Sequence, residues 1–239
     1  MSNWYECPFV SFDTETTGID AETARIVTAA VVFVDPARGS TEVCEWLSDV
    51  DGAEIPAEAA KIHGVTTEYA RKLGLPASEV VAEIAMALDA AWEAGKPVVV
   101  YNAPYDLTLL DRELYRHHNE RPSPVGPVID PLVLDKHYDQ FRRGSRKLAV
   151  AAKHYGIELS EDDAHGATAD ALAAARVAWR MARVFPELAA MQLSELHSKQ
   201  IEWHAEQAAS LQEFFRRKGS DEVVPLDWPV RPVAEEVAA

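Results

Sequence analysis

Two acidic side chains close an apolar run near the start of the chain. In VSFDTETTG (residues 10–18), Asp13 and Glu15 are separated by one residue. Alternate residues of an extended strand point to the same side, so both carboxylates can face one point in space. Carboxylate oxygens at such a point suit a divalent cation. A solvated strand end whose acids cap the next turn is the alternative interpretation. A calcium loop is excluded, because Ala24 occupies the position that needs a bidentate Glu.

Further acids and a histidine occur downstream, each where a regular element is expected to begin. Asp106 follows the run VVVYNAP and lies on the first turn of an expected helix, where a carboxylate is also a common helix-dipole partner. Asp170 opens an Ala-rich helix, and His165 lies five residues before it. Taken singly, each of these residues has an ordinary structural explanation.

As a set, the four acids and the histidine predict a metal site. Four carboxylates gathered without cations would repel one another strongly. Two divalent ions about 3.5–4 Å apart suit phosphoryl transfer, because one activates water and the other stabilises the departing oxygen. Mg²⁺ or Mn²⁺ fits an all-oxygen set of ligands. His165, with an ordinary pKa near neutrality, fits a base that takes the proton of the water.

The segments around these motifs predict an α/β fold. Runs rich in Val, Phe, Ile and Thr predict three strands in a meander, followed by two short strands: 8–13, 25–34, 41–47, 97–102 and 128–130. Helices are expected between the meander and the first short strand, at 57–74 (two short segments) and 78–94, then at 105–118 between the short strands. Further helices are expected after the last strand, at 147–155, 167–184 and 186–218. This order predicts a mixed five-stranded sheet flanked by helices.

Composition limits the class of protein further. The chain has 239 residues, which suits one ordinary domain with an appendage. Its net charge of −16 disfavours a sequence-specific DNA binder but allows an enzyme that grips only a strand end through bound metal. Two cysteines, no long apolar run and no signal peptide at the start indicate a cytoplasmic protein without a membrane partner.

The order and context of the motifs resemble the DEDDh (DnaQ-like) group of 3′→5′ exonucleases, the group that contains the proofreading exonucleases of bacterial DNA polymerase III. The matching segments are FDTETTG at 12–18, IHGVT at 62–66, NAPYDLTLL at 102–110 and the His165–Asp170 pair. The resemblance covers residues 8–184 and implies a ribonuclease H-like fold. It divides the chain into an exonuclease domain, 1–184, and a C-terminal helix with a Pro- and Trp-containing tail, 185–239.

The resemblance also implies roles for individual residues. Two divalent cations would be held by Asp13, Glu15, Asp106 and Asp170, with His165 as the general base. The terminal nucleotide would be contacted by Thr16, Thr17, Gly18, His63, Asn102 and Tyr105. His63 also has a purely structural interpretation, as a histidine between two short helices. The sister branch of the superfamily has Tyr where this chain has Gly166, which excludes that branch.

The implied reaction is hydrolysis of the last phosphodiester at a 3′ end, preferably of single-stranded DNA, with release of a nucleoside monophosphate. An RNA-trimming enzyme of the same family is the rival within the class. A non-catalytic module of a polymerase or repair complex is the rival outside it, and the intact set of acids argues against it. A polymerase or sliding-clamp partner could bind through 185–239, although that segment could also pack on the core or dimerise.

A locally basic stretch precedes the His165 cluster, despite the acidic total. It contains Lys136, His137, Arg142, Arg143, Arg146 and Lys147. Contacts to phosphates upstream of the cleaved end are one interpretation. A solvated loop is the other.

Overall fold

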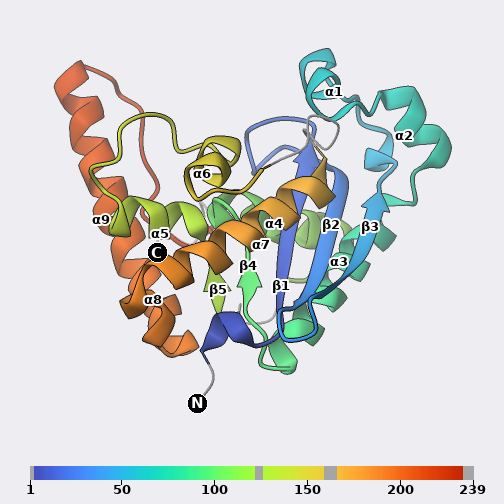
Figure 1. The fold of residues 1–239 in the computed structure, drawn as a ribbon. Coiled ribbons are helices and arrows are strands. Elements are labelled where there is room, and N and C mark those ends of the chain that lie inside the picture. Colours follow the sequence, from blue (N-terminus) through green and yellow to red (C-terminus); the bar gives the residue numbers. More distant parts are fainter. Residues whose placement is uncertain (1–2, 122–125, 159–165, 234–239) are drawn as a thin grey trace.

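The computed structural model describes residues 3–121, 126–158 and 166–233, and these contain a five-stranded sheet in the order β3-β2-β1-β4-β5 (Figure 1). The strands are β1 (Phe9–Thr16), β2 (Ile26–Asp35), β3 (Ser40–Leu47), β4 (Val98–Val99) and β5 (Val128–Ile129). β1, β2 and β3 pair antiparallel, whereas β4 pairs parallel with β1 and with β5. The predicted mixed five-stranded sheet is confirmed.

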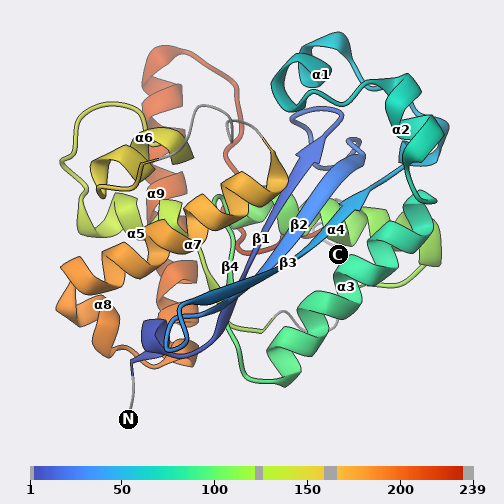
Figure 2. The same ribbon diagram turned by 45° about the vertical axis from the view of Figure 1, so that its right-hand side comes forward.

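Helices cover both faces of this sheet. They are α1 (Ala57–His63), α2 (Thr67–Leu73), α3 (Ala77–Glu93), α4 (Ala103–His118), α5 (Pro131–Tyr138), α6 (Leu148–His154), α7 (Ala167–Val184), α8 (Pro186–Ala190) and α9 (Leu193–Lys218), with short 3₁₀ turns at Trp4–Glu6 and Val50–Gly52. Figure 1 shows α7 lying across one face of the sheet and α3 and α4 behind the other. In Figure 2, α5 and α9 lie together on the side of the molecule away from α3.

β1 runs through the centre of the sheet and aims its two acids at α7. The hydroxyl of Ser11 donates to the carbonyl of Ala171 on α7 over 2.8 Å, which fixes the face that Ser11 occupies. Because side chains alternate along a strand, Asp13 and Glu15 lie on the same face as Ser11. Phe12, on the opposite face, is fully buried. The fold therefore brings both carboxylates to the end of β1 beside the start of α7.

The C-terminal helix differs from the sequence expectation of one element over 186–218. Met191 and Gln192 have extended backbone, with ψ of 142° and 147°, and they separate α8 from α9. The break lets α8 pack against α7 while α9 packs against α5 and β5, and one straight helix could not do both. In the described part of the chain, no helix combines the length and apolar character that crossing a bilayer requires.

Helix α5 was not expected from the sequence. Its start carries two ordinary helix signals, because Asp130 accepts a hydrogen bond from the backbone of Leu132 and Pro131 is the first helical residue. The strand predicted over 128–130 ends at Ile129, and Asp130 is the N-cap of α5. The strand predicted over 97–102 is also shorter than expected: β4 comprises Val98 and Val99, and one further backbone bond, from Val100 to Ile129, follows it.

Candidate active site

Three carboxylates converge where β1 ends and α7 begins. One carboxylate oxygen from each of Asp13, Glu15 and Asp170 lies within 4.8 Å of the others. All three side chains are half-buried, so the cluster is open to a small ion and to water. Asp170 lies on the first turn of α7, one turn after the N-cap Gly166. Two segments about 155 residues apart in the sequence thus supply one acidic site.

Asp106, on the first turn of α4, lies beside these three carboxylates, close enough to Asp13 to repel it, and it is 4% exposed. Its Oδ1 accepts from the backbone N–H of Thr14 over 3.1 Å and from the Thr14 hydroxyl over 2.5 Å. These bonds orient the carboxylate beside β1. Thr14 lies between the two acids of the FDTET motif, and the sequence pattern does not indicate that it orients Asp106.

The electrostatics of the cluster show why it suits a cation. Burial raises the pKa of Asp13 well above its usual range, and repulsion from Asp106, Asp170 and Glu15 adds to this. Burial, followed by repulsion from Asp170, raises the pKa of Glu15 to about 7. Burial also raises the pKa of Asp106 to about 7, against the opposing effect of the bonds from Thr14. A divalent cation would offset the repulsion, and the hard oxygen donors fit Mg²⁺ or Mn²⁺.

We expect Mg²⁺ to stabilise the protein more at pH 8 than at pH 5. The pKa of Glu15 is about 7 in the metal-free fold, against an ordinary value near 4.5. The unfolded chain therefore loses this proton first, and the metal-free fold loses stability as pH rises between these values. Mg²⁺ at about 100 times its Kd should stabilise the fold by about 2.7 kcal/mol, or about 5–10 °C in Tm, at pH 8. At pH 5 protons compete for the ligands, and the shift should be small.

The measurement is a thermal melt with Mg²⁺ and with EDTA at each pH, for the natural chain and Glu15→Gln. Subtracting the Tm with EDTA from the Tm with Mg²⁺ removes the contribution of titratable groups that do not interact with the metal. A Mg²⁺ shift of equal size at both pH values would contradict the metal assignment, as would a full shift in Glu15→Gln.

The turn after β1 is fastened to α4 by hydroxyl groups. The phenol of Tyr105 donates to the carbonyl of Gly18 and lies 2.6 Å from the Thr16 hydroxyl. The Thr17 hydroxyl accepts from the backbone of Arg25, so it closes the turn. Thr16, Gly18 and Tyr105 therefore form one rim of the site, next to Glu15. Their predicted contact with a nucleotide remains a prediction.

His63 and Asn102 lie at two other points around the site. Burial lowers the pKa of His63, and the backbone of Thr16 partly opposes this effect, which places the imidazole beside the turn. Its Nδ1 accepts from the backbone of Val65 over 3.2 Å. Asn102 has a left-handed backbone and is the N-cap of α4, so it shapes the turn that leads to Asp106. Its side chain makes no capping bond.

His165 lies outside the described residues, so its predicted role as a base remains a prediction. The expectation for the basic stretch before it needs correction. Two of its arginines bind the buried Asp135, with Arg142 Nη2 at 2.5 Å and Arg146 Nη1 at 2.6 Å from the same oxygen. These guanidinium groups fasten the 139–147 loop to α5, so the interpretation of a solvated loop is wrong for them. The contact of the basic stretch with phosphates remains a prediction.

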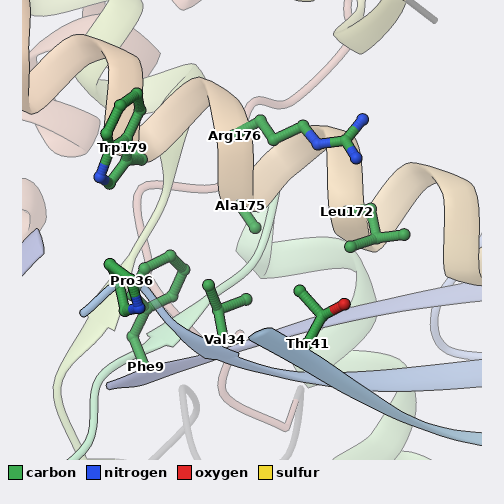
Figure 3. Close-up of a pocket in the computed structure, with 8 residues that line it drawn as sticks. All are labelled: Phe9, Val34, Pro36, Thr41, Leu172, Ala175, Arg176 and Trp179. Carbon is green, nitrogen blue, oxygen red and sulfur yellow. The ribbon is translucent and has the colours of Figure 1, made fainter. Parts of the chain in front are cut away.

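An apolar pocket of about 220 Å³ lies elsewhere, between α7 and the opposite end of β1 (Figure 3). Phe9 and Val34 line it from the sheet, and Leu172 and Trp179 line it from α7. Arg176 is the only charged residue in its wall. The described residues that line it include no carboxylate that could bind a metal ion, whereas the acidic cluster has three, so the acidic cluster is the candidate active site.

The mixed five-stranded sheet flanked by helices is a ribonuclease H-like α/β fold, and the acidic cluster lies at the end of its central strand. Residues 10–178 match the RNase_T family, whose description is exonuclease. The match spans well over half of the chain, and the chain therefore belongs to this exonuclease family. The resemblance inferred from the motifs is confirmed, as is the expectation of an exonuclease.

Relatives of the family differ greatly in length. The epsilon subunit of DNA polymerase III from Rickettsia prowazekii (strain Madrid E) is 26% identical over 172 residues, which are 70% of this chain and 71% of that subunit. A PolC-type DNA polymerase III from Oceanobacillus iheyensis is 28% identical over 180 residues, 75% of this chain but only 12% of the polymerase.

Among solved structures, E. coli exonuclease I in complex with a dA16 oligonucleotide has a TM-score of 0.65 and 21% identity. The similar part covers 76% of this chain and 42% of that enzyme. At this identity the likeness shows the fold alone. The chain spans less than half of exonuclease I and a small part of the polymerase.

Proposed function

We propose that this chain is a DEDDh-type, metal-dependent 3′→5′ exonuclease that removes nucleoside monophosphates from single-stranded DNA. The observation that carries the proposal is the convergence of Asp13, Glu15 and Asp170 within 4.8 Å, with Asp106 beside them. These acids lie inside the segment that matches the exonuclease family, which supports phosphodiester hydrolysis as the reaction of the cluster. DNA is favoured over RNA because the similar epsilon subunit belongs to a DNA polymerase.

In this proposal Asp13, Glu15, Asp106 and Asp170 hold two divalent cations, Mg²⁺ or Mn²⁺. When bound, such a pair would activate water and stabilise the charge of the departing oxygen. Thr14 keeps the Asp106 carboxylate in place through its two hydrogen bonds. The rim formed by Thr16, Gly18 and Tyr105 would bound the pocket of the last nucleotide. His165 would take the proton of the attacking water.

The polymerase or sliding-clamp partner of 185–239 remains a prediction, and so does the division of the chain at residue 184. On α9 the apolar side chains of Ile201, Leu211 and Phe214 are 41%, 41% and 46% exposed. A proofreading or repair role would follow from such a partner. The reaction itself does not depend on that role.

The proposal is tested with 5′-labelled single strands of DNA and RNA of the same sequence. Mg²⁺ should produce a ladder of products shortened from the 3′ end, which EDTA and Asp13→Asn should abolish. The DNA ladder should form faster than the RNA ladder, and a faster RNA ladder would identify an RNA-trimming enzyme. No ladder from either polymer, with Mn²⁺ also tried, would contradict the activity and favour a non-catalytic module.

A further inference from the structure

The C-terminal tail reaches the start of α4 through one buried carboxylate. Asp130 follows β5 and is fully buried. It accepts hydrogen bonds from the backbone N–H groups of Asn102 (3.0 Å), Ala103 (2.9 Å) and Leu132 (2.9 Å). The fourth donor is the indole Nε1–H of Trp228, at 3.3 Å. A single side chain therefore joins the start of α4, the start of α5 and the tail.

The bonds to α4 stabilise a backbone conformation that needs support. Asn102 has φ 66° and ψ 49°, in the left-handed region. Such a conformation of a residue other than glycine costs of order 1–3 kcal/mol and persists where the surroundings hold it. Asp130 holds it with hydrogen bonds to two successive N–H groups at the helix start. Asp106 lies one turn further along the same helix, so the position of its carboxylate depends on this turn.

The tail then follows α4 beyond Asp106. Immediately after α9, the chain turns back and runs alongside α9 toward the sheet (Figures 1 and 2). The backbone N–H of Arg231 donates to the Thr108 hydroxyl over 2.9 Å. Arg112 Nη2 donates to the carbonyls of Arg231 and Pro232, both at 3.0 Å. Residues 108 and 112 are four apart and share one face of α4, which the tail therefore covers.

Helix α9 holds Asp130 from its other side. The side chain of Gln200 is fully buried; its Oε1 accepts from the backbone of Asp130 over 2.7 Å and its Nε2 donates to the carbonyl of Val128 over 2.8 Å. His197 Nδ1 accepts from the backbone of Val128 over 3.1 Å. These bonds occupy backbone groups at the edge strand β5. Both the backbone and the carboxylate of Asp130 thus depend on the segment after residue 184.

We propose that Asp130 and Trp228 are positioning residues for Asp106, and that the C-terminal tail thereby sets the affinity of the site for divalent cations. The inference rests on the proposed function in one respect, the assignment of Asp106 as a metal ligand. It makes the segment 193–233 part of the catalytic unit.

The test is Mn²⁺ binding to the full chain by calorimetry, without nucleic acid. Trp228→Phe keeps an aromatic ring in the core and removes the Nε1–H donor. Losing one hydrogen bond should weaken Mn²⁺ binding about two- to tenfold. Asp130→Asn, which keeps the side-chain shape, is the second variant and should weaken binding at least as much.

The matched control is Trp4→Phe. Trp4 and Trp228 are each 5% exposed, and the Nε1–H of Trp4 donates to the carbonyl of Leu188 over 3.1 Å, remote from α4. This variant should lose comparable packing and keep the Mn²⁺ affinity of the natural chain. Equal Mn²⁺ affinity in Trp228→Phe and the natural chain would overturn the proposal. Equal weakening in Trp4→Phe would also overturn it, because general loss of packing would then be the cause. The binding measurement stays informative even if no exonuclease activity is found.

Discussion

Replacing Asp13 with Asn is expected to lower kcat/KM for DNA hydrolysis at least about 10³-fold and to raise the Tm of the metal-free protein. A metal ion stabilises the charge of the transition state by several kcal/mol, and each 1.36 kcal/mol is worth a factor of ten in rate. Asp13 faces the other three acids of the cluster, each of which raises its pKa. Removing its charge relieves that repulsion, so the fold gains stability while the metal site is lost.

The two readouts together separate a catalytic role from a structural one. Asp89→Asn is the control, because Asp89 on α3 also has a raised pKa, caused by burial and by Glu93, but lies outside the cluster. It should leave kcat/KM within about twofold. An Asp13→Asn enzyme that cleaves at the normal rate would refute the metal assignment. A variant that loses activity because it no longer folds would refute the predicted gain in stability.

The parts of the fold and site that the sequence revealed are those encoded by local patterns. The alternation in FDTET predicts that Asp13 and Glu15 share a face, and the Ala-rich run after Gly166 predicts the helix that presents Asp170. Both patterns act over a few residues. The meeting of these two segments followed from the order of strands and helices, together with the family resemblance, and the observed cluster agrees with it.

The parts that sequence analysis missed depend on contacts between distant segments. The partner that immobilises Arg142 and Arg146 is Asp135, and only the folded loop brings both guanidinium groups to one carboxylate. The bond from Trp228 to Asp130 spans 98 residues, and neither residue has a local pattern that indicates it. The broken C-terminal helix likewise reflects two different packing partners and not a helix-breaking residue.

His165→Ala is expected to reduce kcat by about 10²–10⁴-fold, the range for a general base, while Mn²⁺ binding stays within about twofold. The prediction uses the position of this histidine, immediately before the N-cap Gly166 and five residues before Asp170. Loss of the base should also remove the step in the pH–rate profile near the ordinary pKa of histidine, about 6.5. Single-turnover rates across pH 5.5–8.5 measure both effects.

His63 provides the sharpest comparison, because it is the histidine that the described structure places beside the turn after β1. Its Nδ1 accepts a hydrogen bond from the backbone of Val65, so the neutral ring carries its proton on Nε2. The lone pair of Nδ1 is then in use and Nε2 already carries a proton, so the ring is poorly suited to take a proton from water. His63→Ala should therefore change KM more than kcat, and it should retain the step near pH 6.5. If His63→Ala instead lost that step and His165→Ala kept it, the two roles would be reversed. Loss of Mn²⁺ binding in His165→Ala would make that histidine a metal ligand.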